Sequence, residues 1–137
     1  MDPVFQSFLN GLPTLLLHFS VTVAMLALGI GIYQWITPWR EMDLIRSGNM
    51  AAATSFSGAI VGLALPLAFC MATSVSVLDI IIWGVVALVV QLITFRLADI
   101  FLKGLPKRIE DGEMGAAILV VAVKLAVAMI NAAAIAG

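Results

Sequence analysis

The residue best placed to do chemistry in this sequence is a lysine inside a long apolar segment. Lys124 lies near the middle of the stretch from Met114 to Ala136, and that stretch holds no other charged side chain. An ionisable group near the centre of a bilayer is costly, and it usually faces a bundle interior or a wet cavity. Lys124 therefore needs a polar partner on another segment.

Two amides are placed to meet this lysine. Gln91 lies at a similar depth in the preceding apolar segment, so we expect it to be the hydrogen-bond partner of Lys124. Asn131 follows Lys124 by about 700° of helix rotation, which puts the two side chains on one face. A wider polar path would also include the histidine nearer the outer surface, so its candidate members are Lys124, Gln91, Asn131 and His18.

Two interpretations of this lysine stand open. In the functional one, the desolvated amine of Lys124 releases and regains a proton along a hydrated path. In the structural one, the amine bonds Gln91 or backbone carbonyls while its stem snorkels. No carboxylate lies in the middle of an apolar segment, so half of the usual relay chemistry is missing and the structural interpretation is favoured.

A second constellation lies near the expected outer surface. His18, Cys70 and Asp79 fall at similar depths on three different segments, and these residue types can form a nucleophilic triad or a metal site. Similar depth says nothing about lateral proximity, so we expect Cys70 to be a small core residue and His18 an interhelical donor. Phosphate-binding glycine loops and zinc-protease motifs are absent, and we expect no enzyme activity, metal or cofactor.

Two further features concern packing and the inner boundary. Arg96 and Asp99 lie three residues apart, which predicts a local ion pair or, alternatively, an anionic-headgroup contact through Arg96. Gly58 and Gly62 form a small-residue motif that allows helices to approach closely. Pro66 lacks a backbone donor, so it predicts a kink that frees the Gly62 carbonyl for a neighbouring Ser or Thr or, alternatively, a cation.

The composition places these residues in lipid. The chain is 63% hydrophobic and 11% charged with a mean hydropathy of +1.15, whereas soluble domains are about 45–50% apolar and about 25% charged. A net charge of −1 gives no basic surface for nucleic acid. Four segments are long enough to cross a hydrocarbon core of about 30 Å as helices: Pro13 to Ile36, Asn49 to Ala72, Val77 to Leu102 and Met114 to Ala136. The predicted fold is an all-α integral membrane bundle of four transmembrane helices.

The basic residues predict the orientation of this bundle. They concentrate in the first and last connections, and cytoplasmic loops carry such an excess. We therefore expect a multi-pass membrane protein with both charged loops cytoplasmic and both termini outside. Trp35 and Trp39, with Tyr33 nearby, would be interfacial aromatics. The basic loop residues are Arg40, Arg46, Lys103, Lys107 and Arg108.

The two halves of the chain resemble each other. The identities cluster where each charged loop enters the next apolar segment, and they pair Ile45 with Ile109, Gly48 with Gly112, Met50 with Met114, Ala52 with Ala116 and Ala53 with Ala117. We expect a single domain of two tandem helix-loop-helix repeats, about 1–72 and 73–137, that enter the membrane in the same direction.

Three motifs also carry a resemblance to a known family. They read Asp-Leu-Ile-Arg-x-Gly-Asn-x-Ala-Ala-Ala over 43–53, Gly-Ala-Ile-Val-Gly-Leu-Ala-Leu-Pro over 58–66 and Gly-Glu-Met-Gly-Ala-Ala-Ile over 112–118. In these motifs, and over nearly its whole length, the chain resembles the small bacterial YjfL-type membrane proteins, domain-of-unknown-function family 350. The resemblance implies a four-helix inner-membrane protein without an assigned activity, so it supplies no site residues.

Two functions are therefore expected. The first is a non-enzymatic, oligomeric inner-membrane protein that acts as a scaffold or subunit of an envelope-associated assembly. It is motivated by the small-residue clusters, and its partners would be the lipid bilayer and a second copy or another membrane protein. The alternative is a small channel or proton- or ion-coupled transport unit whose polar path surrounds Lys124.

Overall fold

The computed structural model describes residues 2–37, 41–102 and 104–137. The predicted interfacial residue Trp39 and the predicted loop residues Arg40 and Lys103 therefore lie outside the described residues. Every regular element in these ranges is a helix. In chain order they are α1 (Pro3–Ile36), α2 (Glu41–Arg46), α3 (Met50–Thr73), α4 (Val77–Phe101), α5 (Leu105–Glu110) and α6 (Met114–Ala136).

Four of these helices, α1, α3, α4 and α6, are long and apolar enough to cross a membrane, which confirms the predicted fold. The first begins earlier than expected, at Pro3 rather than at Pro13, and continues through Pro13. Its start has a local cause, because the Asp2 carboxylate accepts a 3.0 Å hydrogen bond from the backbone nitrogen of Val4. Pro3 is also well suited to the first helical turn, since its nitrogen needs no acceptor there.

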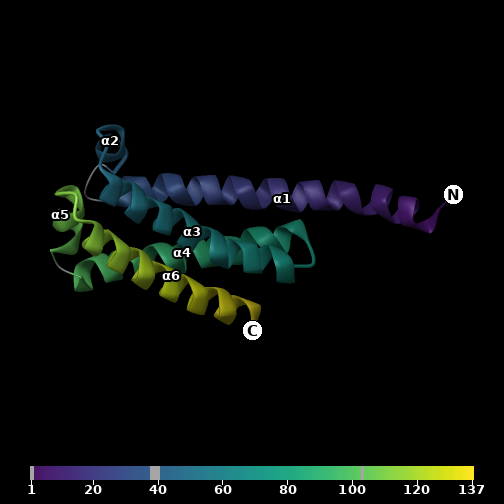
Figure 1. The fold of residues 1–137 in the computed structure, drawn as a ribbon. Coiled ribbons are helices and arrows are strands. Elements are labelled where there is room, and N and C mark those ends of the chain that lie inside the picture. The colour runs from purple at the N-terminus through teal and green to yellow at the C-terminus, as the bar shows by residue number, and fades with distance from the viewer. Residues whose placement is uncertain (1, 38–40, 103) are drawn as a thin grey trace.

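The helices form an up-and-down bundle with two distinct ends (Figure 1). Both chain termini lie at one end, which we call the terminal end, and the short helices α2 and α5 lie at the other, which we call the loop end. Helix α3 packs most extensively on α6, while α1 packs on α3 and α4. This arrangement places the basic loops together and away from both termini.

The glycine motif of α3 makes its close contacts inside this chain. A Cβ atom on Gly58 would lie 2.6 Å from the side chain of Val121, and one on Gly62 would lie 2.7 Å from the ring of Phe95. Glycine at both positions therefore lets α3 approach α6 and α4 closely. Pro66 is buried, and α3 runs through it to Thr73.

The two loop-end junctions share one geometry. Helices α2 and α5 each have six residues, and each is followed by a glycine with positive φ, 93° at Gly48 and 88° at Gly112. The residue after each glycine donates to a carbonyl in the short helix, Asn49 to Leu44 and Glu113 to Arg108, both at 2.9 Å. This is a helix-ending turn that favours glycine. The division into repeats at 1–72 and 73–137 stays a prediction.

Candidate functional site

Lys124 is enclosed completely by the bundle, with no exposed surface. Its Nζ atom donates a 3.1 Å hydrogen bond to the hydroxyl of Tyr33 on α1. The same Nζ lies 3.8 Å from Oδ1 of Asp99 on α4, which completes an ion pair. The prediction that Gln91 is the hydrogen-bond partner was wrong. The side chain of Lys124 turns toward the loop end, where it meets the phenol of Tyr33 and the carboxylate of Asp99.

The hydroxyl of Tyr33 connects this lysine to a second carboxylate. It donates a 3.0 Å hydrogen bond to Oε1 of Glu41, the first residue of α2. Tyr33 is 2% exposed and Glu41 is 4% exposed, so both ends of this bond are shielded from solvent. An unbroken hydrogen-bond chain therefore runs from Lys124 through Tyr33 to Glu41.

Two aromatic rings complete the enclosure of the lysine. Its Nζ lies 5.0 Å from the ring centre of Tyr33 and 5.2 Å from that of Phe95, within the range of cation–π attraction. The two rings meet edge to face with centres 6.1 Å apart. The ammonium thus has a hydroxyl, a carboxylate and two ring faces around it. We call Lys124, Tyr33, Asp99 and Glu41 the lysine cluster.

Asp99 takes a different role from the predicted one. Among the described residues its ion pair is with Lys124, not with Arg96 three residues before it. The reason is the face of α4 on which it lies, because Asp99 follows buried Phe95 by four residues and so points into the bundle. Arg96 lies beside this face and is partly exposed. Its contact with a lipid headgroup stays a prediction.

The two amides of the predicted path, Gln91 and Asn131, form a pair separate from Lys124. Asn131 donates from Nδ2 to Oε1 of Gln91 at 3.0 Å and to the backbone oxygen of Ala87 at 3.4 Å. Phe95 follows Gln91 by one turn and precedes Asp99 by one turn, so its buried ring lies between this pair and the lysine cluster. The expected polar path is therefore interrupted by an aromatic side chain.

Buried polar atoms without hydrogen-bond partners occur on both sides of the Phe95 ring. Within the described part of the chain, Nε2 of Gln91 and Oγ of Ser55 are buried and have no hydrogen-bond partner. Buried polar groups in proteins are nearly always bonded, often to water. These two atoms therefore mark places in the core where a small polar ligand such as water would be bound.

The three residues His18, Cys70 and Asp79 do not line one site near the terminal end. Cys70 and Asp79 line one cavity of about 290 Å³, but His18 is not among its lining residues. The thiol of Cys70 instead contacts the Ser74 hydroxyl at 3.8 Å and the Ile80 backbone oxygen at 3.7 Å. Within the described ranges no three His, Cys, Asp or Glu side chains are arranged to hold a metal ion.

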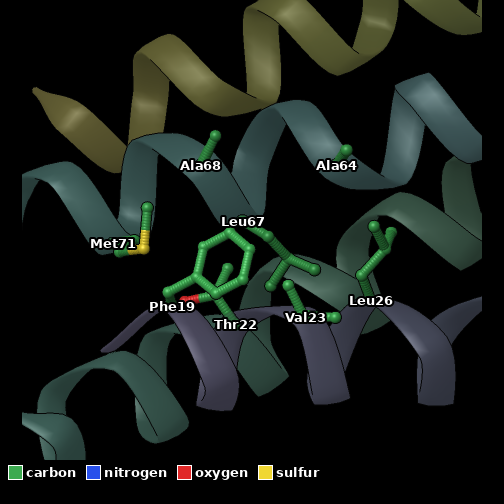
Figure 2. A pocket seen from close by; sticks show the side chains of 8 residues that line it. All are labelled: Phe19, Thr22, Val23, Leu26, Ala64, Leu67, Ala68 and Met71. Carbon is green, nitrogen blue, oxygen red and sulfur yellow. The ribbon is translucent and has the colours of Figure 1, made fainter. Parts of the chain in front are cut away.

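Figure 2 shows a groove between α1 and α3, and His18 is not among the residues that line it. Thr22 points its hydroxyl back to the His18 carbonyl at 2.7 Å, so the groove presents almost only apolar surface. Its volume is about 150 Å³, and no titratable side chain lines it. The chemistry of the described residues thus gathers at the lysine cluster and not here. The lining residues are Phe19, Thr22, Val23, Leu26, Ala64, Leu67, Ala68 and Met71.

Sequence reasoning missed two members of the lysine cluster. The sequence predicts that Tyr33 is an interfacial aromatic near Trp35, but of these two residues only Trp35 is exposed, at 84%. A usable signal was the four-residue spacing of Met25, Gly29 and Tyr33, which are the buried residues of α1. Glu41 carried no such signal, because it lies beyond the end of the first span.

Comparisons with known proteins agree with this architecture. The chain is 34% identical over 116 residues to the inner membrane protein YjfL of Escherichia coli K12, covering 85% of this chain and 88% of that protein. It is 30% identical over 86 residues to the transmembrane protein YshE of Bacillus subtilis 168, covering 63% of this chain and 64% of that protein. No solved structure matches the chain. The model of the Domain of Unknown Function (DUF350) matches residues 7–135, and the chain therefore belongs to the DUF350 family of membrane proteins.

Proposed function

We propose that this chain is a non-enzymatic, proton-coupled transport unit of the bacterial inner membrane. The observation that carries the proposal is the lysine cluster, in which Lys124, Tyr33 and Glu41 form one buried hydrogen-bond chain and Asp99 faces the amine. Intramembrane ionisable residues with such partners are typical of proton relays. The mid-span lysine thus has the carboxylates that the sequence alone did not place beside it.

The cost of the cluster favours a role beyond packing. Lys124, Glu41 and Asp99 are 0%, 4% and 9% exposed, and each buried charge costs several kcal/mol before pairing. Apolar side chains of similar volume fill such a space at equal or lower free energy. Ionisable groups kept in that position are therefore best explained by the protons that they exchange.

The hydrogen bonds define a balanced route for one proton. A proton leaving Nζ of Lys124 forms an O–H bond at the Tyr33 oxygen as the phenolic proton moves to Oε1 of Glu41. Tyr33 is regenerated, and the products are a neutral amine and a neutral carboxyl group. Asp99 opposes this transfer by stabilising the charged amine, so it holds the proton on Lys124 between transfers.

Phe95 provides the barrier that a coupled device needs. Its ring is 1% exposed and separates the lysine cluster from the pair of Gln91 and Asn131. Passage to the terminal end would require this ring to rotate while the amides and bound water carry the proton. A closed resting state follows from this arrangement, with conduction limited by the motion of Phe95.

Proton flux in liposomes tests the proposal. The purified protein is reconstituted in phosphatidylethanolamine and phosphatidylglycerol vesicles, a potassium diffusion potential is imposed, and a trapped pH dye reports proton entry. We expect flux above that of empty vesicles, at least a tenfold loss in Lys124→Met, and a similar loss in Tyr33→Phe, which keeps the ring but removes the hydroxyl.

The matched control makes the same substitution at an exposed lysine, Lys107→Met, and should conduct like the unaltered protein. Each variant is first shown to be folded by circular dichroism and gel filtration. Unaltered protein that conducts no better than empty vesicles would refute the proposal. Equal flux in the unaltered protein and in folded Lys124→Met would refute it as well.

The proposed orientation follows the basic loops. Helices α2 and α5 hold Arg46, Lys107 and Arg108 at the loop end, and such residues favour the cytoplasm. Glu41 would then exchange protons with the cytoplasm, and both termini would lie outside. In a Cys70→Ala background, an impermeant thiol reagent added to intact cells should label Gly137→Cys but not Arg108→Cys. The reverse pattern would overturn this orientation.

A second candidate is the scaffold or assembly subunit. It is favoured by α1, of which only 11% of the most apolar window is buried within this chain. The apolar surface left over would accept helices of a second copy or of another membrane protein. The glycines of α3 do not support it, because Gly58 and Gly62 pack internally. Native mass spectrometry from nanodiscs should find oligomers under this alternative, and a lone monomer would exclude self-assembly.

A further inference from the structure

The first ten residues of α1 have a pattern unlike the rest of that helix. At 100° per residue, the apolar side chains of 3–12 fall within an arc of about 140°. That face holds Val4, Phe5, Phe8, Leu9 and Leu12. The opposite face holds Gln6, Ser7, Asn10 and Gly11. From Thr14 to Ile36 the helix has no Lys, Arg, Asp or Glu and is mainly apolar on every face, as expected of a span in lipid.

Nothing in the described part of the chain covers the apolar face of 3–12. Every residue of this segment is exposed, with Val4 at 76% and Phe8 at 54%. The first buried residue of α1 is Met25, which lies beyond the midpoint of the helix. The segment therefore needs an apolar medium from outside the chain.

Helix α1 is too long for residues 3–12 to lie in the hydrocarbon core if the helix is straight. Its 34 residues extend about 51 Å. To fit within about 30 Å of hydrocarbon, a straight helix of that length would tilt by roughly 54°. Membrane helices tilt by about 0–40°. The partner helices have only 23 to 25 residues, and the N-terminal part of α1 runs well beyond them (Figure 1).

A proline lies at the boundary between the two patterns. Pro13 is inside α1, and its ring nitrogen cannot donate to the carbonyl of Leu9. Prolines are the commonest cause of sharp bends in long helices. The residues after Pro13 span the membrane without help, since those up to Ile36 already extend about 35 Å. The weakest point of the helix thus separates an amphipathic segment from a spanning one.

We propose that residues 3–12 bind the lipid surface at the terminal end of the bundle, bent at Pro13 so that the helix lies in the membrane–water interface. Phe5, Phe8 and Leu12 then enter the boundary between headgroups and acyl chains, while Gln6 and Asn10 face water. The segment contains no Lys or Arg, so apolar burial drives the binding and anionic lipid is not required.

Spin-label accessibility tests this placement. In a Cys70→Ala background, single labels are placed at Phe8→Cys and Asn10→Cys on opposite faces, in phosphatidylcholine nanodiscs that hold one copy each. We expect the label at position 8 to collide mainly with oxygen and the label at position 10 mainly with a water-soluble nickel chelate. Val85→Cys, at an exposed position of α4, serves as the lipid reference, and Lys107→Cys serves as the water reference.

Each outcome decides the proposal. Equal nickel accessibility at positions 8 and 10 would show a straight helix in water and overturn it. Protection of position 8 only in discs that hold two copies would assign the face to a second copy instead. The variant Pro13→Ala, which restores the backbone donor, should raise nickel accessibility at position 8 at least twofold, and no change would remove the proline from the account. These readouts do not depend on proton flux.

Discussion

The Nζ atom of Lys124 on α6 lies 3.1 Å from the hydroxyl of Tyr33 on α1, inside the bundle and shielded from solvent. This bond joins the first and last spanning helices, which also meet where Nζ lies 5.0 Å from the Tyr33 ring centre, whereas α1 packs mainly on α3 and α4. It also links the lysine to Glu41 at the loop end. The stability of the bundle and its chemistry therefore depend on the same few atoms.

Removing the lysine should destabilise the protein strongly. Lys124→Met leaves the Asp99 carboxylate buried without its partner, which costs about 3–5 kcal/mol of unfolding free energy. Lys124→Met combined with Asp99→Asn should recover at least half of that loss, because the uncompensated charge is gone. Denaturation in mild detergent, followed by circular dichroism, measures both. Strict additivity of the two substitutions would contradict the ion pair.

Removing the hydroxyl of Tyr33 should lower the stability of the bundle even though the aromatic ring stays in place. Tyr33→Phe removes one acceptor from Lys124 and one donor from Glu41, and each lost hydrogen bond to a charged group costs about 1.5–3 kcal/mol. The control Trp35→Phe changes an exposed ring and should alter stability by about 0.5 kcal/mol or less. Equal denaturation midpoints for Tyr33→Phe and Trp35→Phe would argue against the hydrogen-bond chain.

The glycine of α3 that faces α6 should tolerate no methyl group. Gly58→Ala places a Cβ 2.6 Å from the Val121 side chain, and overpacking of this kind costs about 1–3 kcal/mol. Gly115→Ala in α6 meets nothing within 4 Å and should be neutral or slightly stabilising. Adding Val121→Ala to Gly58→Ala should restore stability. A failure of that rescue would place the cause elsewhere.

The two loop-end glycines should respond alike. Gly48→Ala and Gly112→Ala both force a side chain into a positive-φ conformation, at a cost of about 1–2 kcal/mol. Neither added Cβ meets an atom within 4 Å, so the penalty comes from the backbone alone. Closely matched losses in thermal stability would support equivalent junctions. A loss at only one position would count against the proposed repeats.

The membrane architecture could be predicted from composition and segment length. Four apolar runs allow few alternatives, since every backbone polar group in lipid must be satisfied within its own helix. The start of α1 was missed, because the helix continues through Pro13 to the cap at Asp2, and the short helices α2 and α5 were not predicted. Whether a segment forms a helix depends on its local sequence, so the spanning helices are the feature of this protein that is easiest to predict.

The lysine cluster could be predicted only in part. The apolar surroundings of Lys124 in the sequence indicate that its side chain turns inward. The prediction of Gln91 as its partner, however, compared the membrane depths of the two Cα atoms. A lysine side chain extends several methylene groups away from its backbone, and here it reaches toward the loop end, where Asp99 and Tyr33 lie. Which helices are neighbours is decided by packing between distant segments, and one sequence does not contain that information in readable form.

Solid-state NMR in lipid bilayers tests the central claim most directly. With lysine side-chain nitrogens and aspartate carboxyl carbons labelled, a dipolar contact between Nζ of Lys124 and Cγ of Asp99 is expected. The contact should vanish in Lys124→Met, which leaves the exposed Lys107 as an internal comparison. Absence of that contact in the unaltered protein, with the Lys124 nitrogen close to acyl-chain protons instead, would contradict the account.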